Sequence, residues 1–110
     1  MLIYKTKTIQ KFKKLEKKIK KNSSKIILYG CSNFALEFLL HTNILDNVIY
    51  ITDSNNIYHQ KKRFGKKVIS PKKLNKIKFD KIIITSKAFS SDIKNNLLSL
   101  NISRNKIIQL

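Results

Sequence analysis

The sequence predicts an α/β fold built on a short parallel sheet, and three features support that prediction. Two runs of apolar residues, 26–29 and 82–84, contain no alternating polar positions. Such runs are typical of strands that are buried on both faces of a parallel sheet. A third apolar run covers Val48–Thr52. Stretches with helical apolar spacing lie between these runs, and this alternation favours a sheet with helices on both faces.

Length and composition indicate a single domain. A chain of 110 residues that is 42% hydrophobic can bury one core but not two. No apolar run reaches the length of a transmembrane segment, and no secretory signal peptide is recognised. The single cysteine, Cys31, excludes an intramolecular disulfide and fits a reducing compartment. We therefore expect a cytoplasmic protein.

The formal net charge of +18 points toward an anionic partner. However, the positive charge comes almost entirely from lysine, since the chain has only two arginines, Arg63 and Arg104. Proteins that read nucleic acids use arginine for bidentate contacts and aromatic rings for stacking. We therefore do not expect specific nucleic-acid binding. Electrostatic binding to nucleic acid or anionic lipid stays open, as does an AT-rich coding sequence as the origin of the lysines.

Residues 1–22 are predicted to form a basic amphipathic helix that precedes a domain of residues 23–110. Its apolar residues fall on one narrow stripe at helical spacing, and lysines cover the rest. The stripe can dock on the domain's own sheet, bind a partner or a second copy, or lie on an anionic membrane. We favour docking or dimerisation, because the stripe is narrow and lacks tryptophan. The stripe consists of Ile9, Phe12, Leu15 and Ile19.

The first apolar run leads directly into Gly30, and a helix is expected to follow from Ser32 or Asn33 to about Thr42. Strand, glycine turn and helix open a nucleotide-binding βαβ unit. The fingerprint G-x-G-x-x-G/A is matched by GCSNFA at 30–35, with serine in place of the second glycine. The helix is apolar around most of its circumference, so we expect it to be well covered. His41 is expected to cap its end.

Asp53 closes the second strand at the position where a ribose-binding acid is expected. The carboxyl ends of parallel strands meet at one edge of a sheet, so Gly30 and Asp53 are predicted to lie side by side. The sequence that follows, Ser54-Asn55-Asn56, also allows Asp53 to form an Asx-turn, and the two roles are compatible.

The rest of the chain completes the sheet. Residues 57–67 are expected to form a surface connection that brings Lys61, Lys62 and Arg63 near any phosphate. Residues 64–65 are expected to form a turn that is followed by a short strand at 67–69. Ser70-Pro71 is expected to begin a brief helix. A strand at 81–85 is expected to precede a helix from Ser90 or Ser91, and 106–110 is expected to form a closing strand or an edge segment. Right-handed crossovers then give a three-layer sandwich with strand order 3-2-1-4-5.

At this point the chain resembles the small Rossmann-like N-terminal domains of bacterial surface-polysaccharide enzymes. These are the nucleotide-sugar-binding domain of sugar acetyltransferases and the N-terminal domain of capsule-type nucleoside-diphosphate-sugar epimerases. The matching pieces are ILYGCSNFA at 27–35, IYITDSN at 49–55, GKKVISPKKL at 65–74 and FDKIIITS at 79–86. The resemblance implies that a nucleotide, nucleotide sugar or dinucleotide binds at the glycine turn. Ser32 departs from the fingerprint and favours a nucleotide sugar over NAD.

The expected mechanism is binding. Backbone N–H groups at 31–34 and the following helix dipole would receive phosphate, and Asp53 would accept a hydrogen bond from a ribose or base. No catalytic motif is recognised, and whether a partner enzyme supplies chemistry stays open. The alternative is a non-catalytic interaction or dimerisation module that uses residues 1–22. The expected ligand-binding residues are Gly30, Cys31, Ser32, Asn33, Phe34, Asp53, Ser54, Thr85 and Ser86.

Overall fold

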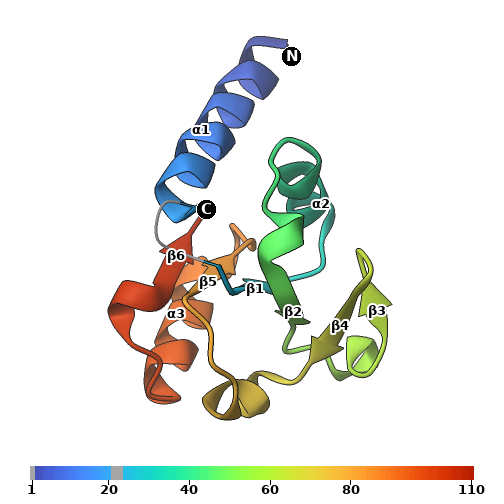
Figure 1. Ribbon diagram of the computed structural model, residues 1–110, viewed down its shortest axis with the longest axis vertical. Coiled ribbons are helices and arrows are strands. Elements are labelled where there is room, and N and C mark those ends of the chain that lie inside the picture. Colours follow the sequence, from blue (N-terminus) through green and yellow to red (C-terminus); the bar gives the residue numbers. More distant parts are fainter. Residues whose placement is uncertain (1, 21–23) are drawn as a thin grey trace.

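The computed structural model describes residues 2–20 and 24–110. It is a mixed α/β fold with one six-stranded, mostly parallel sheet (Figure 1). The expected boundary between residues 22 and 23 lies outside the described residues. The strands are β1 Ile26–Tyr29, β2 Val48–Thr52, β3 Lys62–Arg63, β4 Lys66–Ile69, β5 Lys81–Ile84 and β6 Ile107–Gln109. The α-helices are α1 Leu2–Lys20, α2 Asn33–Leu40 and α3 Ser90–Ser99.

The strand order is β3-β4-β2-β1-β5-β6. The five parallel strands, β4-β2-β1-β5-β6, follow the predicted order 3-2-1-4-5. In register, Leu28 pairs with Ile51 on one side and Ile83 on the other. Short 3₁₀ helices connect several elements: η1 Leu45–Asn47, η2 Asn56–Tyr58, η3 Pro71–Lys76 and η4 Arg104–Lys106.

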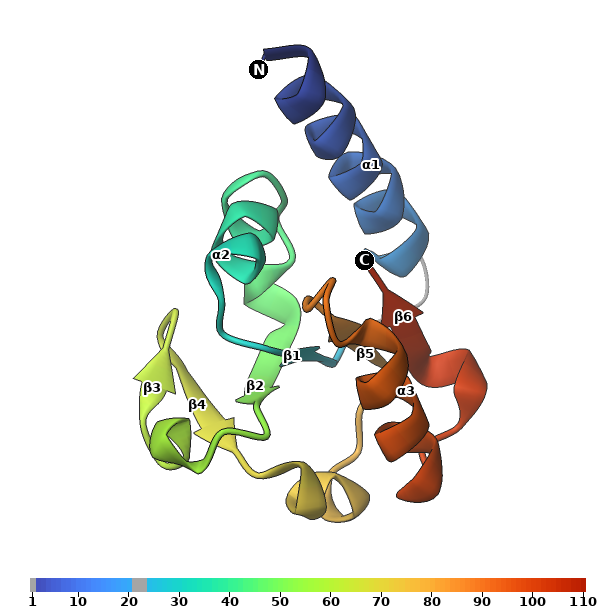
Figure 2. The ribbon, with the colours of Figure 1, turned by 180° about the vertical axis from the view of Figure 1, so that it is seen from behind.

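Helices cover both faces of the sheet, as Figures 1 and 2 show. Successive residues of a strand point to opposite faces, so β1 contributes Ile26 and Leu28 to one core and Ile27 and Tyr29 to the other. The first core also contains buried side chains of α1 and α2. The second contains Leu97 and parts of η3. These two cores explain why the strands have no polar alternation.

The amphipathic helix docks on the domain itself. Phe12 and Ile19 of α1 are each 1% exposed and belong to the first core. The Phe12 ring packs edge-on against Phe38 of α2 at 5.2 Å between centroids. In addition, Glu16 Oε2 accepts a hydrogen bond from the Asn43 backbone N–H at 2.6 Å. Three interpretations of the apolar stripe were considered. Its two buried residues, Phe12 and Ile19, pack on the chain's own domain, as the first interpretation expects.

The expectation that α2 is covered around most of its surface is wrong. Ala35, Phe38 and Leu39 are buried, but Leu36 is 39% exposed and Leu40 is 70% exposed. The helix has eight residues and rests on the sheet with one side only, so apolar side chains on the other side reach solvent. Sequence hydrophobicity does not reveal which side is covered.

The surface connection at 57–67 contains a strand that was not predicted. β3 pairs antiparallel with β4, and Phe64 and Gly65 connect them with φ values of 53° and 77°. Two consecutive residues with positive φ are typical of a tight hairpin turn, so the expected turn is confirmed. Lys62 and Arg63 are exposed and carry no apolar pattern, which explains why the strand was missed.

No helix within residues 2–20 or 24–110 is both long and apolar enough to cross a membrane.

Candidate functional site

A hollow of about 400 Å³ lies at the carboxyl edge of the sheet, where β1, β2 and β5 end. The chain segments that follow these three strands supply its wall, and the amino-terminal end of α2 borders it. Its lining contains polar hydroxyls, one carboxylate and aromatic rings. The lining residues are Tyr29, Gly30, Cys31, Ser32, Asp53, Ser54, Tyr58, Ser86, Phe89 and Ile93.

Gly30 forms the turn between β1 and α2 with φ of +116°, a conformation that side chains other than hydrogen rarely allow. A Cβ at this position would also collide with Thr85 Oγ1. The Gly30 N–H donates to the Thr52 carbonyl at 2.8 Å, which ties the turn to the end of β2. The glycine is therefore required by the local backbone and packing.

Thr85 lies beneath the hollow and not in its wall. Its side chain is fully buried, and Oγ1 donates to the Tyr29 carbonyl at 2.8 Å. The hydroxyl that the sequence suggested for ligand binding is thus used to join β5 to β1. Ser86, the next residue, does line the hollow, and its Oγ accepts from the Phe89 N–H at 3.2 Å.

Asp53 forms the Asx-turn that the sequence allows, and it lies in the wall of the hollow. Its Oδ1 accepts from the Asn55 N–H at 2.9 Å, which is an Asx-turn, and the residue also lines the hollow. Its backbone carbonyl lies 2.6 Å from His59 Nε2. The Asx-turn holds the carboxylate at the end of β2, beside the turn that contains Gly30. The predicted neighbourhood of Gly30 and Asp53 is confirmed.

Cys31 is 5% exposed, and its thiol interacts with the Asp53 carboxylate. Burial, the negative charge of Asp53 and a hydrogen bond to that carboxylate raise the pKa of Cys31 to about 12, against a smaller opposing effect of Arg63. A thiol with this pKa carries almost no thiolate at neutral pH and is a poor nucleophile. Cys31 is thus a buried, weakly reactive residue of the turn between β1 and α2.

Tyr29 is a site residue that the sequence did not reveal. It belongs to a continuous apolar strand and is 2% exposed, yet it lines the hollow. Burial raises the pKa of its phenol above the ordinary value, whereas hydrogen bonds with Ser54 and Asn96 lower it. The phenol therefore links the second core to the loop after β2.

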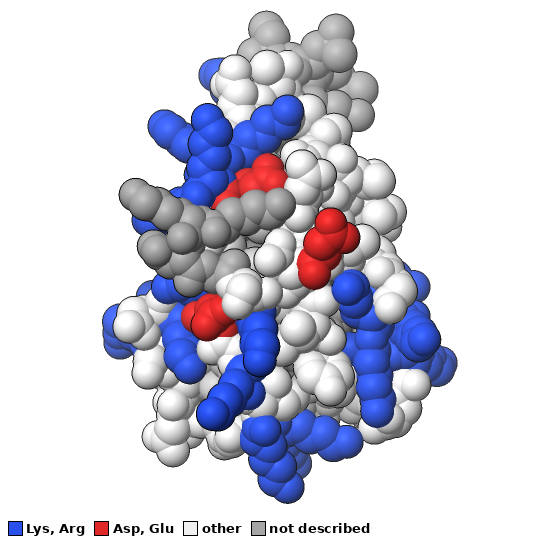
Figure 3. Space-filling model, in the orientation of Figure 1, with Lys and Arg blue, Asp and Glu red and all other residues white. Residues whose placement is uncertain are grey.

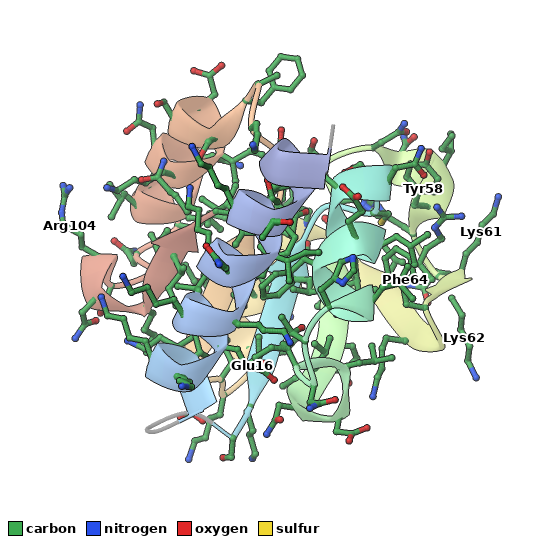
Figure 4. All side chains as sticks on the ribbon, turned by 90° about the horizontal axis from the view of Figure 1, so that it is seen from above. Glu16, Tyr58, Lys61, Lys62, Phe64 and Arg104 are labelled. Atoms are coloured by element: carbon green, nitrogen blue, oxygen red, sulfur yellow. The ribbon has the colours of Figure 1, made fainter. Side chains whose placement is uncertain are left out.

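Arg63 reaches the glycine turn from the β3–β4 hairpin. Its Nη2 donates to the Cys31 carbonyl at 3.1 Å, and its guanidinium lies 5.7 Å from the centroids of both the Tyr58 and Phe64 rings. Lys61 and Lys62 point outward from the hairpin in Figure 4. Of the three basic residues expected near a phosphate, Arg63 is therefore the one held beside the turn.

Two other predicted residues lie next to the hollow but not in its lining. Asn33 begins α2, and Phe34 packs against Phe12 at 5.5 Å between ring centroids. Lys87 Nζ lies 4.7 Å from the centroid of the Phe34 ring. Tyr58 and Phe89, which do line the hollow, were not predicted. The only feature of the sequence that could have indicated them is their type and place: each is an aromatic residue in the segment that follows a predicted strand.

The described residues, 2–20 and 24–110, contain no group of three or more histidine, cysteine or acidic side chains that could hold a metal ion.

Two comparisons with known proteins bear on the chain. Residues 22–108 match the model of a family described as C2185-like, N-terminal. This match covers strands β1 to β5, the first two residues of β6, helices α2 and α3, and the residues that line the hollow. No curated protein matches the chain.

Proposed function

The chain belongs to the C2185-like, N-terminal family, and we propose that it is a Rossmann-like domain that binds a nucleotide or nucleotide sugar in the hollow. We further propose that it works in bacterial surface-carbohydrate biosynthesis in the cytoplasm, by binding rather than by catalysis. The resemblance of segments 27–35, 49–55, 65–74 and 79–86 to domains of such enzymes supports this pathway.

One observation carries the proposal: the Gly30 turn and Asp53 line a single hollow at the carboxyl ends of parallel strands. From β1 the chain proceeds to β2 and β4 on one side, and then crosses to β5 on the other side of β1. In open α/β sheets, ligands bind at the carboxyl edge where the strand order reverses in this way. The hollow lies at that point.

The residues around the hollow offer complementary chemistry for a phosphorylated, hydroxyl-bearing ligand. The first N–H groups of α2 and the positive end of its dipole attract phosphate, and Arg63 adds a cation beside them. The Asp53 carboxylate accepts hydrogen bonds from ribose hydroxyls or a base N–H. Tyr58 and Phe89 provide ring faces. The volume of about 400 Å³ is within the range of small-molecule pockets.

The net charge of +18 supports the capture of anions but cannot select among them. Selectivity must come from groups that contact the uncharged part of the ligand. Asp53 is such a group, because a carboxylate repels phosphate and attracts hydroxyl and N–H donors. The protonated Cys31 thiol donates a hydrogen bond to that carboxylate. This bond helps to hold the carboxylate in position, where it can still accept hydrogen bonds from a ligand.

Isothermal titration calorimetry tests the proposal. The full chain is titrated with UDP-glucose, NAD and coenzyme A, and with inorganic pyrophosphate as a matched anion that lacks a sugar and base. We expect saturable binding of at least one nucleotide that is stronger than binding of pyrophosphate. Equal affinity for the nucleotides and pyrophosphate would assign the heat to charge alone and contradict the proposal, as would absence of binding at millimolar ligand.

A further inference from the structure

The outer surface of α1 is a continuous basic face. Six lysines among the described side chains of α1 are exposed, and five of them line one shallow hollow away from the buried stripe of Phe12 and Ile19. We call this surface the lysine face. Figure 3 shows basic side chains gathered over α1, with acidic groups as isolated patches. The lysine face consists of Lys7, Lys11, Lys13, Lys14 and Lys17.

The lysine face continues into a groove between α1 and α2. Lys13 and Lys17 line this groove together with Leu40, the last residue of α2, and His41, which follows it. Leu40 is 70% exposed, more than any other large apolar residue described, and Leu36 one turn earlier is 39% exposed. Exposed leucine beside a row of lysines combines apolar and cationic groups on one surface. This combination is typical of surfaces that rest on anionic bilayers.

Two acidic residues lie near this surface and do not reverse its sign. Glu16 lines the groove, and its carboxylate accepts a hydrogen bond from the Asn43 N–H. Glu37 is exposed on α2. Five lysines therefore face two carboxylates, which leaves an excess of positive charge. Like charges on two copies of the chain oppose a homodimer through the same face.

We propose that the lysine face and Leu40 together bind an anionic lipid membrane. The apolar stripe of α1 packs in the protein core, so α1 lies on the bilayer and its lysines bind lipid headgroups. Leu40 enters the boundary between headgroups and acyl chains. Nucleic acid fits this surface less well, because α1 has no arginine and an exposed leucine makes no stacking contact with a base.

Vesicle co-sedimentation of the full chain tests the proposal. Vesicles of phosphatidylcholine alone are compared with vesicles in which about a third of the lipid is phosphatidylserine. The variant Lys7→Gln/Lys11→Gln/Lys14→Gln is compared with Lys72→Gln/Lys73→Gln/Lys76→Gln, which removes the same charge from η3 on the opposite face of the sheet. We expect binding to phosphatidylserine vesicles only, reduced about a hundredfold by the first variant. The second variant should reduce it severalfold at most.

A second pair of variants separates the apolar contribution from charge. Leu40→Ser should reduce binding to the anionic vesicles about fivefold, whereas Ile57→Ser, at an exposed residue of η2, should not. Circular dichroism checks that all variants are folded. Equal losses in the two lysine variants would overturn the proposal. So would unchanged vesicle binding of Leu40→Ser, duplex DNA binding that exceeds vesicle binding at equal salt, or a dimer that Leu40→Ser converts to a monomer.

Discussion

Thr85 occupies the space that a side chain at residue 30 would need. A Cβ on Gly30 would collide with Thr85 Oγ1, and that oxygen is fixed by its hydrogen bond to the Tyr29 carbonyl. Two factors thus require glycine at this position: its φ of +116° and the closeness of Thr85, which follows the neighbouring strand. The backbone at the rim of the hollow consequently has no room for a side chain at residue 30.

We predict that Gly30→Ala lowers the free energy of unfolding by about 2–4 kcal/mol, because it adds backbone strain and a steric clash. The cost should be smaller in a Thr85→Ala background, where the clash is relieved and the strain stays. Urea unfolding of the four members of this cycle measures the coupling. Equal costs of Gly30→Ala in both backgrounds would show that Thr85 is not the source of the restriction.

Asp53 is predicted to discriminate nucleotides from simple anions. Asp53→Ala should weaken nucleotide binding by about 1–3 kcal/mol, because a hydrogen bond to the ligand is lost. Binding of pyrophosphate should be unchanged or stronger, since a negative charge is removed. Asp46→Ala is the matched control: it removes the same charge from η1, at the opposite end of β2. Calorimetry measures all three proteins, and a loss of similar size in the control would contradict a specific role.

Arg63 is predicted to support the phosphate end of the ligand. Its contact with the Cys31 carbonyl and its position over the Tyr58 ring hold the guanidinium beside the turn. Arg63→Gln should weaken binding of a nucleoside diphosphate about tenfold. It should have hardly any effect on binding of the corresponding uncharged nucleoside. Lys62→Gln removes a neighbouring charge that points outward, so it should have little effect. If the two variants lose affinity equally, net charge rather than position is responsible.

The sheet could be predicted from the sequence because its signals are local and strong. Apolar runs marked β1, β2 and β5, and the connections between them gave the order that the structure has. β3 was missed because Lys62 and Arg63 are exposed and its pairing depends on the hairpin turn. The exposure of Leu40 could not be predicted either, since the side of α2 that faces the sheet depends on packing.

The site was predicted in part, for a similar reason. Gly30 and Asp53 follow strands directly, so topology alone brings them together. Thr85 follows a strand as well, but its hydroxyl bonds to the neighbouring strand, and no sequence pattern distinguishes that arrangement from a hydroxyl facing a ligand. Tyr58 ends η2 and Phe89 precedes α3, and the paths of these connecting segments depend on the tertiary structure.

Cys31 is predicted to make the protein less stable at alkaline pH. The pKa of its thiol is raised to about 12 in the folded state, from an ordinary value of 9.0. Between these values the unfolded chain has lost the proton and the folded chain retains it, so the free energy of unfolding falls as pH rises. Cys31→Ala should lose less stability over this interval, as measured by urea unfolding. Tyr29, whose pKa is also raised, contributes in the same direction, so Tyr29→Phe is the companion variant.

The same environment predicts low thiol reactivity at neutral pH. Alkylation of folded Cys31 by iodoacetamide should be much slower than that of the urea-unfolded chain. Asp53→Asn should accelerate it, because the carboxylate is one of the groups that raise the pKa of the thiol. Alkylation at the same rate in the folded and unfolded chain would show that the thiol is neither buried nor held protonated.

Asp80 is predicted to fasten the start of β1 to the start of β5. Its Oδ2 accepts from the backbone N–H groups of Lys25 and Ser24, each at 2.9 Å, and these bonds lower the pKa of the carboxyl. The stabilisation is therefore complete above the unfolded pKa, close to 3.8, and is lost as pH falls through the lower folded value. Asp80→Asn should destabilise the protein by about 1 kcal/mol at neutral pH.

The pH dependence distinguishes this role from a general effect of charge. The difference in unfolding free energy between the parent protein and Asp80→Asn should shrink as pH falls below about 4, because the parent carboxyl then becomes neutral too. Asp46→Asn, an exposed acid on η1, should leave neutral-pH stability almost unchanged. Removing any acid from a chain with a net charge of +18 increases self-repulsion. Equal destabilisation by the two variants would therefore assign the effect to net charge, and a larger effect of Asp80→Asn to its hydrogen bonds with Ser24 and Lys25.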